Sequence, residues 1–270
     1  MINPLSSISS LWANRQLSAQ FTRREVEGRY KGSYLGIFWS FLTPMIMLAL
    51  YTFVFGLVFK GSWPSPRGTN TIGDFALAMF AGQIAFQVVG EPVGRAATII
   101  TAVPNFVKKV IFPLEILPIV GVASALIHAM ISLVILVIGS IWIYGGVPWT
   151  IILTPIVLVP NILLAVGLSW FLASLGVFLR DVGFITSVVM QCLFFASPVF
   201  YPVSAVPENY RWILMINPLT PSIESLRLVA INGQVPVMSD MLPSFFIGLI
   251  VACLGYVWFM QTRKGFADVL

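Results

Sequence analysis

Charged residues are scarce in this sequence. It has 15 Lys and Arg and 10 Asp and Glu among 270 residues, which is 9%, whereas a typical soluble domain has about 25%. So few charges cannot cover the surface of a soluble globule, and 58% of the residues are hydrophobic. The composition therefore excludes a soluble enzyme, a disordered chain and a nucleic-acid-binding module, and it predicts an integral membrane protein.

Groups suited to catalysis or metal binding are also scarce. His128 is the single histidine, and Cys192 and Cys253 lie within apolar runs, so the sequence offers no disulfide framework and no set of metal ligands. No Gly-Lys dipeptide occurs, which excludes the P-loop for nucleotide phosphates. We therefore expect no catalytic residue, no metal and no cofactor in this chain. The alternative is an intramembrane hydrolase that uses His128 with Ser169, although a lone histidine in a membrane helix is more often a packing residue.

Long runs with few or no charges predict six membrane-spanning helices. A helix needs about 20 mostly apolar residues to cross the hydrocarbon core. The runs are 32–59, 72–93, 116–179, one that begins near Val182, and one from Met241 to about Gln261. The run 116–179 is too long for one helix, and the turn-forming segment Tyr144–Trp149, with Gly-Gly and Pro, divides it in two. The predicted fold class is all-α and polytopic, in a single domain over residues 1–270.

The Lys and Arg residues are divided unevenly between the two sets of span ends. One set holds 11 of them, namely Arg15, Arg23, Arg24, Arg29, Lys31, Arg95, Lys108, Lys109, Arg180, Arg263 and Lys264. The other set holds 4, namely Lys60, Arg67, Arg211 and Arg227. The positive-inside rule therefore places both termini in the cytoplasm. On this reading the chain has a cytoplasmic interface helix (1–31), a six-span region (32–261) and a cytoplasmic tail (262–270).

The first thirty residues predict an amphipathic helix that lies along the inner membrane surface. The stretch is polar and basic, and serines near its start are suitable helix caps. Trp12 and Phe21 would be costly in water, and the arginines can approach anionic headgroups. The alternative is an ordinary basic flank that only fixes the orientation of the chain.

The segment 95–115, between spans two and three, predicts one short cytoplasmic helix. It is basic and contains Pro104 and Pro113, and proline favours the start and the stop of a helix. Its apolar residues either form a contact surface for a partner or rest on the membrane and the other spans. These residues are Phe106, Val107, Ile111 and Phe112.

The stretch 195–232 is apolar but interrupted by Pro198, Pro202, Pro207, Pro218 and Pro221. No single helix spans a membrane through so many prolines. Non-helical backbone at membrane depth persists only inside protein or beside a watery cavity. Between spans five and six we therefore expect short re-entrant helices on the outer face. A plain external loop is the alternative, but it would leave Trp212–Ile216 in water.

Three stretches, in order along the chain, resemble the ABC-2 type permeases, the membrane subunits of polysaccharide-exporting ABC transporters. The first is RREVEGRYKGSYLGIFWSFLTPMIMLALYTFVFGLVF (23–59), similar to the family's entry into its first span. The second is FLRDVG (178–183), at the inner turn between spans four and five. The third is SPVFYPVSAVPENYRWILMINPLTPSIESLR (197–227), similar to the family's outer re-entrant region.

The resemblance implies a homodimer of this chain bound to two cytoplasmic ATPase subunits, which would bind the Mg-ATP. It implies a location in the bacterial cytoplasmic (inner) membrane, in contact with membrane lipids. The substrate that it implies is a lipid-linked glycan, with O-antigen placed ahead of capsule and teichoic acid. An ABC-2 permease for a drug or a lipid cargo is the alternative.

The resemblance also implies roles for four groups of residues. The coupling helix that docks on the ATPase corresponds to Asn105, Phe106, Val107, Lys108 and Lys109. The entrance site for a lipid pyrophosphate corresponds to Arg23, Arg24, Arg29 and Lys31. Arginine suits that role because its guanidinium binds phosphate through two parallel hydrogen bonds. The channel wall corresponds to Tyr34, Phe38, Trp39 and Phe41. The outer gate corresponds to Pro198, Phe200 and Tyr201.

Overall fold

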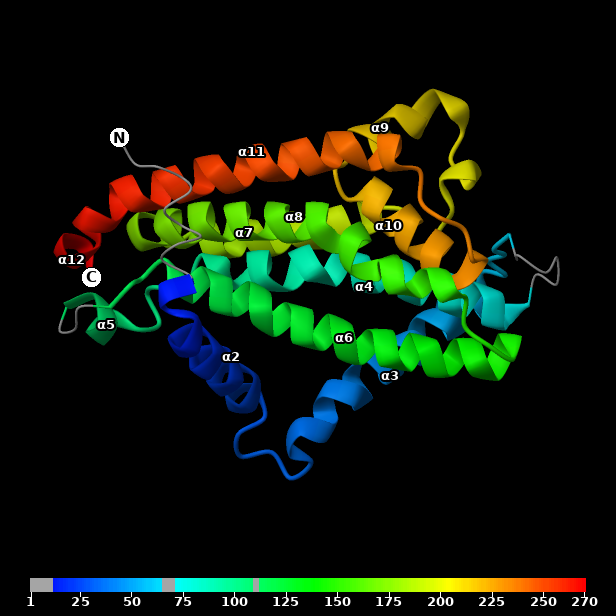
Figure 1. Cartoon of the computed structure of the whole chain (residues 1–270), viewed down its shortest axis with the longest axis horizontal. Helices are drawn as coiled ribbons and strands as arrows, with labels where there is room; N and C mark the ends of the chain where they lie inside the picture. The colour runs from blue at the N-terminus through cyan, green and yellow to red at the C-terminus, as the bar shows by residue number, and fades with distance from the viewer. Residues whose placement is uncertain (1–11, 65–70, 109–111) are drawn as a thin grey trace.

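The computed structural model describes residues 12–64, 71–108 and 112–270, and within these ranges it contains helices and no strand (Figure 1). The longer helices are α2 (Arg15–Arg29), α3 (Trp39–Tyr51), α4 (Ile72–Ala96), α6 (Ile116–Tyr144), α7 (Thr154–Phe178), α8 (Val182–Ala196) and α11 (Met238–Thr262). The short ones are α5 (Pro104–Lys108), α9 (Arg211–Ile216), α10 (Thr220–Arg227) and α12 (Phe266–Val269). Turns of 3-10 helix are η1 (Gly36–Phe38), η3 (Trp149–Leu153), η4 (Val203–Ala205), η5 (Glu208–Tyr210) and η7 (Arg263–Gly265), and η2 (Thr52–Val58) and η6 (Leu228–Asn232) are π-helical. The predicted all-α class is confirmed.

Five helical segments in the described ranges are long and apolar enough to cross a membrane. They are Gly36–Val58, Ile72–Ala96, Ile116–Tyr144, Trp149–Phe178 and Met238–Val269. The predicted break in the long run 116–179 is confirmed, because Gly145 ends α6 in the left-handed conformation at φ 73° and Pro148 precedes η3. The run that begins at Val182 forms α8, whose 15 residues extend about 22 Å at 1.5 Å per residue. That length is less than a hydrocarbon core of about 30 Å.

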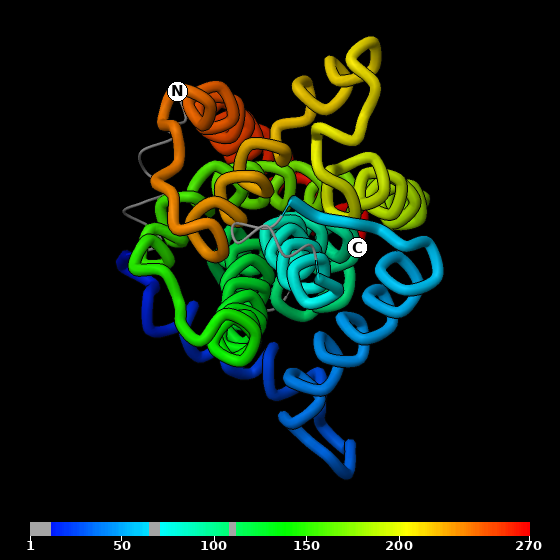
Figure 2. Tube along the Cα trace, turned by 90° about the vertical axis from the view of Figure 1, so that its right-hand side faces the viewer, coloured from blue at the N-terminus to red at the C-terminus, as the bar shows by residue number. Residues whose placement is uncertain are grey.

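Helix α4 lies in the middle of the bundle (Figure 2). In its most apolar part 78% of the residues are buried, and it packs against α6, α7, α8 and α10. Its first turn is fixed by a capping box, in which Thr71 N–H donates to the Asp74 carboxylate over 2.7 Å. Tyr144, at the end of α6, donates to the same carboxylate over 2.6 Å. These hydrogen bonds thus offset the cost of burying the Asp74 carboxylate at the start of the helix.

Helices α7 and α11 approach each other closely through glycines. A Cβ atom on Gly255 would lie 2.2 Å from the carbonyl oxygen of Gly167, and one on Gly167 would lie 2.4 Å from the backbone of Val251. A Cβ on Gly248 would lie 2.8 Å from the carbonyl oxygen of Pro160. Without a hydrophobic driving force between helices in lipid, small residues at such contacts allow close backbone packing.

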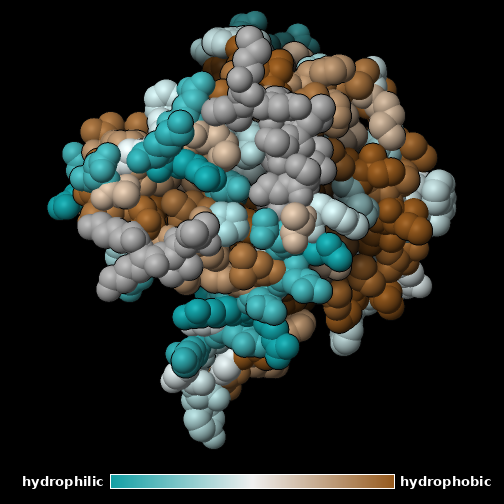
Figure 3. All heavy atoms as spheres, turned by 60° about the vertical axis from the view of Figure 1, so that its left-hand side comes forward, coloured by the Kyte–Doolittle hydropathy of each residue, from teal (hydrophilic) through white to brown (hydrophobic). Residues whose placement is uncertain are grey.

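The two ends of the bundle differ in character. We call the end that carries α5 and α12 the α5 end, and the end that carries α9 and α10 the α10 end (Figure 1). Figure 3 shows hydrophilic atoms gathered where the α5 end comes forward and a hydrophobic flank beside them. At the same end Phe266 of α12 is fully buried, with its ring 5.5 Å from that of Phe259 and 5.9 Å from that of Phe178.

Substituting Gly255 with Ala should loosen the α7–α11 contact. The added methyl group meets the Gly167 carbonyl, so the helices must separate, which typically costs about 1–3 kcal/mol. We expect a lower apparent Tm in detergent than for the wild type. Gly94→Ala is the matched control, because a Cβ there meets no atom within 4 Å and alanine favours helix. Equal melting of Gly255→Ala and Gly94→Ala would contradict the close contact.

Candidate functional site

A cavity of about 830 Å³ lies between α2, α4, α6 and the segment that leads to α5. The cationic side chains on its wall are Arg24, Arg29, Lys31 and Arg95. The anionic ones are Glu25, Glu27 and Glu91. We call this space the first cavity. Its dense charge is unusual in a chain with 9% charged residues, and it makes the first cavity the candidate site for a charged ligand.

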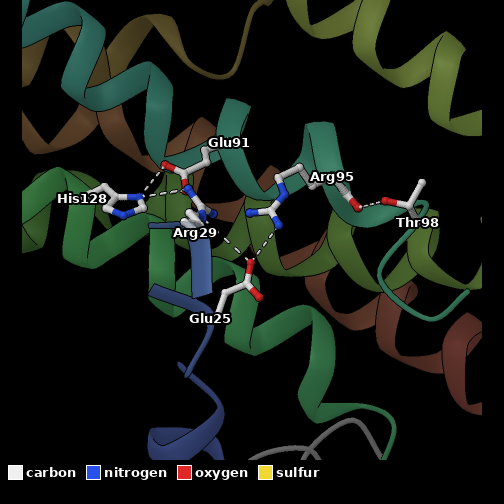
Figure 4. A network of polar contacts seen from close by, with 6 residues as sticks. All are labelled: Glu25, Arg29, Glu91, Arg95, Thr98 and His128. Carbon is white, nitrogen blue, oxygen red and sulfur yellow. Dashed lines mark hydrogen bonds and ion pairs between the residues drawn. The ribbon is translucent and has the colours of Figure 1, made fainter. Parts of the chain in front are cut away.

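A network of charges ties α2 to the bundle (Figure 4). Arg29 forms a close ion pair with Glu91 of α4, and Arg95 pairs with Glu25 of α2 over 2.8 Å. Glu91 also accepts a hydrogen bond from Nδ1 of His128, on α6, over 2.9 Å. The Arg29 and Glu91 side chains are only 22% and 19% exposed. The attraction between the two charges therefore offsets the hydration that each of them has lost on burial.

The predicted entrance residues lie mostly along the first cavity. Arg24, Arg29 and Lys31 line it, whereas Arg23 does not. The exposed Arg23 side chain donates to Glu27 over 2.7 Å, and this hydrogen bond raises the pKa of Arg23. The sequence prediction did not include Arg95, Glu91 or His128 in the site. A signal existed for two of them, since Glu91 and Arg95 follow an apolar run within one helical turn of each other.

The predicted channel residues Tyr34, Phe38, Trp39 and Phe41 line neither the first cavity nor a second, smaller one described below. Tyr34 is fully exposed, and Phe38 and Phe41 are also exposed. Trp39 donates from its ring nitrogen to the hydroxyl of Ser33 over 2.8 Å. The same stretch of chain instead lines the second cavity with Ser40, Thr43, Pro44 and Met47.

The predicted gate residues Pro198, Phe200 and Tyr201 lie in the turn that follows α8. Phe200 is buried at the centre of an aromatic cluster, with ring centroids 4.6–5.5 Å from those of its neighbours. These neighbours are Tyr51, Phe55, Phe194 and Phe195. The Tyr201 hydroxyl donates to the carbonyl of Phe195 over 3.2 Å. The cluster therefore joins the end of the first span to the turn after α8.

Arg227 fixes α10 to its surroundings. It is 3% exposed, and it donates over 2.8 Å to each of the carbonyls of Ala78 and Val199 and to the Glu224 carboxylate. Its guanidinium carbon also lies 4.2 Å from the ring centroid of Trp63. Burial lowers the pKa of Arg227 to about 10 and raises the pKa of Glu224, and the attraction between the two opposes both shifts. Arg227 is therefore charged at neutral pH and joins four segments of the chain.

The predicted coupling residues Asn105–Lys108 lie in or beside α5, and Lys109 falls outside the described residues. Phe106 is half-buried, and its ring stacks on that of Phe112 at 4.9 Å and meets that of Phe21, on α2, edge-on at 5.7 Å. Asn105 is exposed and Val107 is half-buried. Phe106 and Phe112 thus contact Phe21 of α2 within the chain.

Comparison with known proteins identifies the family. A model of the family described as "ABC-2 type transporter" matches residues 16–231. The chain belongs to this family. It is 28% identical to "O-antigen export system permease protein RfbA" of Myxococcus xanthus, over 97% of this chain and 98% of that protein. A protein of the same name from Klebsiella pneumoniae is 25% identical, over 92% of this chain and 93% of that protein. "Polysialic acid transport protein KpsM" of Escherichia coli is 22% identical, over 78% of this chain and 80% of that protein.

The geometry of this ABC-2 family member does not support the hydrolase alternative. Ser169 is buried, and its hydroxyl has no hydrogen-bond partner among the described residues. His128 is instead held at Nδ1 by Glu91, so the serine–histidine contact of an activated nucleophile is not formed. Within the described residues no group of three or more His, Cys, Asp or Glu side chains is placed to hold a metal ion.

Replacing Arg227 with Met should destabilise the α10 end. The change leaves Glu224 and two carbonyls without their donor, and breaking one partner of a buried ion pair typically costs about 3–5 kcal/mol. We expect a marked fall in apparent Tm and partial recovery in the double variant Arg227→Met with Glu224→Gln. Arg211→Met is the matched control, because Arg211 is only half-buried and bonds to loop carbonyls. A fall no larger than in this control would contradict the role of Arg227.

Proposed function

We propose that this chain is the membrane-spanning permease subunit of an ABC exporter that moves a lipid-linked polysaccharide, most specifically O-antigen, across the bacterial cytoplasmic membrane. The observation that carries the proposal is the set of four cations on the wall of the first cavity, Arg24, Arg29, Lys31 and Arg95, which suits the pyrophosphate of a lipid carrier. The printed names of the relatives agree, and they match this chain over most of both lengths. An ABC-2 permease for a drug or a lipid has less support, because an apolar cargo needs no such set of cations.

In this proposal the α5 end lies in the cytoplasm and α8 is a short fifth span. Helix α2, the last turn of α4 and the turn between α11 and α12 lie toward the α5 end (Figure 1), and they carry Arg24, Arg29, Arg95 and Arg263, in agreement with the positive-inside rule. Helix α2 then rests at the inner surface, and α9 and α10 form the re-entrant region on the outer side. The hydrophobic flank contacts lipid and a second copy of the chain, which completes a homodimer.

The energy for transport would come from two ATPase subunits that bind Mg-ATP and dock at α5. This chain has no P-loop of its own. A push on α5 would reach α2 through the contacts of Phe106 and Phe112 with Phe21. Because α2 also carries Arg24 and Arg29, the movement would rearrange the first cavity. ATP binding would thereby bias the permease between two packings.

Deletion of the gene should trap lipid-linked glycan on the cytoplasmic leaflet and remove it from the cell surface. Surface glycan is measured with a lectin or an antibody on intact cells, and trapped glycan by extraction from inverted vesicles. Supplying the wild-type chain should restore export, but not in a strain whose ATPase partner cannot hydrolyse ATP. Normal surface glycan in the deletion strain would contradict the proposed cargo.

A further inference from the structure

A second cavity, of about 390 Å³, lies between α3, α4 and α6. It shares Arg29 and Glu91 with the first cavity, and its volume is at the small end of the range of about 300–1,000 Å³ for ligand sites. Arg29 is the one cation on its described wall. The neutral side chains with hydrogen-bonding groups on that wall are Tyr30, Ser40, Thr43, Gln87 and Ser132. The second cavity is therefore polar but nearly free of positive charge, unlike the first.

Glu91 supplies hydrogen-bond acceptors to the second cavity. Its two carboxylate oxygens lie 2.9 and 3.2 Å from Nδ1 of His128, which donates to them. The other ring nitrogen of His128, Nε2, is buried and does not face the cavity. Because a carboxylate has lone pairs for more than one donor, Glu91 can accept hydrogen bonds from hydroxyl groups in the cavity as well as from His128.

The remaining wall of the second cavity is apolar. Phe86, Pro44 and Met47 line it, and the Phe86 ring continues into the aromatic cluster through Phe194, at 4.9 Å. The face of an aromatic ring is electron-rich and attracts C–H groups. Hydroxyl acceptors on one side and an aromatic ring on the other match the chemistry of a sugar ring. A phosphate would be better held in the first cavity, and a lipid tail would leave the polar groups unpaired.

We propose that the second cavity binds the sugar unit attached directly to the lipid pyrophosphate, with Glu91 accepting hydrogen bonds from its hydroxyl groups. This inference rests on the proposed function. Arg29 marks the boundary between the two subsites, since it lines both cavities and pairs with Glu91. A phosphate that competes for Arg29 frees lone pairs of Glu91 for the sugar next to it.

The test compares two probes on the purified complex of this chain with its ATPase subunits in lipid nanodiscs. One probe is a polyprenyl diphosphate, and the other is the same diphosphate carrying a single N-acetylhexosamine. We expect the wild type to bind the sugar-bearing probe more tightly. Glu91→Gln should lower affinity for that probe by about tenfold, the effect of one hydrogen bond to a charged group. Glu91→Gln should bind the bare diphosphate at least as tightly, because Arg29 loses a competing anion.

Two further variants separate sugar binding from folding and from charge. Ser132→Leu adds an apolar side chain to the wall of the second cavity and leaves Arg29, Glu91 and His128 in the sequence, and it should abolish the advantage of the sugar-bearing probe. Glu27→Gln removes a carboxylate that lines the first cavity but not the second, and it should leave that advantage intact. These variants also decide the question if Glu91→Gln does not fold.

Three results would overturn the inference. The first is a wild type that binds the two probes with equal affinity. The second is a Ser132→Leu variant that prefers the sugar-bearing probe as strongly as the wild type does. The third is an equal loss of affinity for both probes in Glu91→Gln, in which case Glu91 only positions Arg29. In each of these the bare diphosphate still binds, so the proposed function survives. Absence of binding by both probes to the wild type would overturn the proposed function together with the inference.

Discussion

The arrangement of the two cavities depends on one interaction, the ion pair between Arg29 and Glu91. Helix α2 is polar, so hydrophobic burial alone gives little reason for it to dock on the bundle. Its contacts with the other helices instead combine the pairs Arg29–Glu91 and Arg95–Glu25 with the aromatic contacts of Phe21. Both cavities have Arg29 and Glu91 in their walls, so this pair defines the two spaces and separates them.

The positions of the spans could be predicted from the sequence because they depend on length and apolarity alone. A long uncharged run must become a helix in lipid, and Gly-Gly with Pro must interrupt it, as the turn after Tyr144 shows. The length of α8 was less predictable. Its apolar run continues to Phe200, but Pro198 ends the helix at Ala196, and the following turn is used in the aromatic cluster.

The site was only partly predictable, for a physical reason. The arginines of α2 are clear in the sequence, but their partners are remote, since Arg29 pairs with Glu91 of α4 and Arg95 of α4 pairs with Glu25 of α2. Which face of α3 lines a cavity was also hidden, because that helix is apolar on all sides and periodicity cannot orient it. The small polar side chains of Ser40 and Thr43, which line the second cavity, therefore give no signal in the sequence.

Helix α4 connects the two ends of the molecule. Its residue Glu91 belongs to the charge network, and Ala78, about 20 Å away at 1.5 Å per residue, accepts a hydrogen bond from Arg227. Gly82 provides the space for that guanidinium, because a Cβ there would lie 2.4 Å from it. A shift of this central helix would therefore disturb the contacts of both ends, as alternating states of a transporter require.

The most direct measurement is a cryo-electron microscopy structure of the permease with its ATPase subunits and a bound lipid-linked oligosaccharide. We expect the diphosphate in the first cavity, within hydrogen-bonding distance of Arg29, with the first sugar between Glu91 and Phe86. A diphosphate bound elsewhere, with the Arg29–Glu91 pair intact and both cavities unchanged, would contradict it.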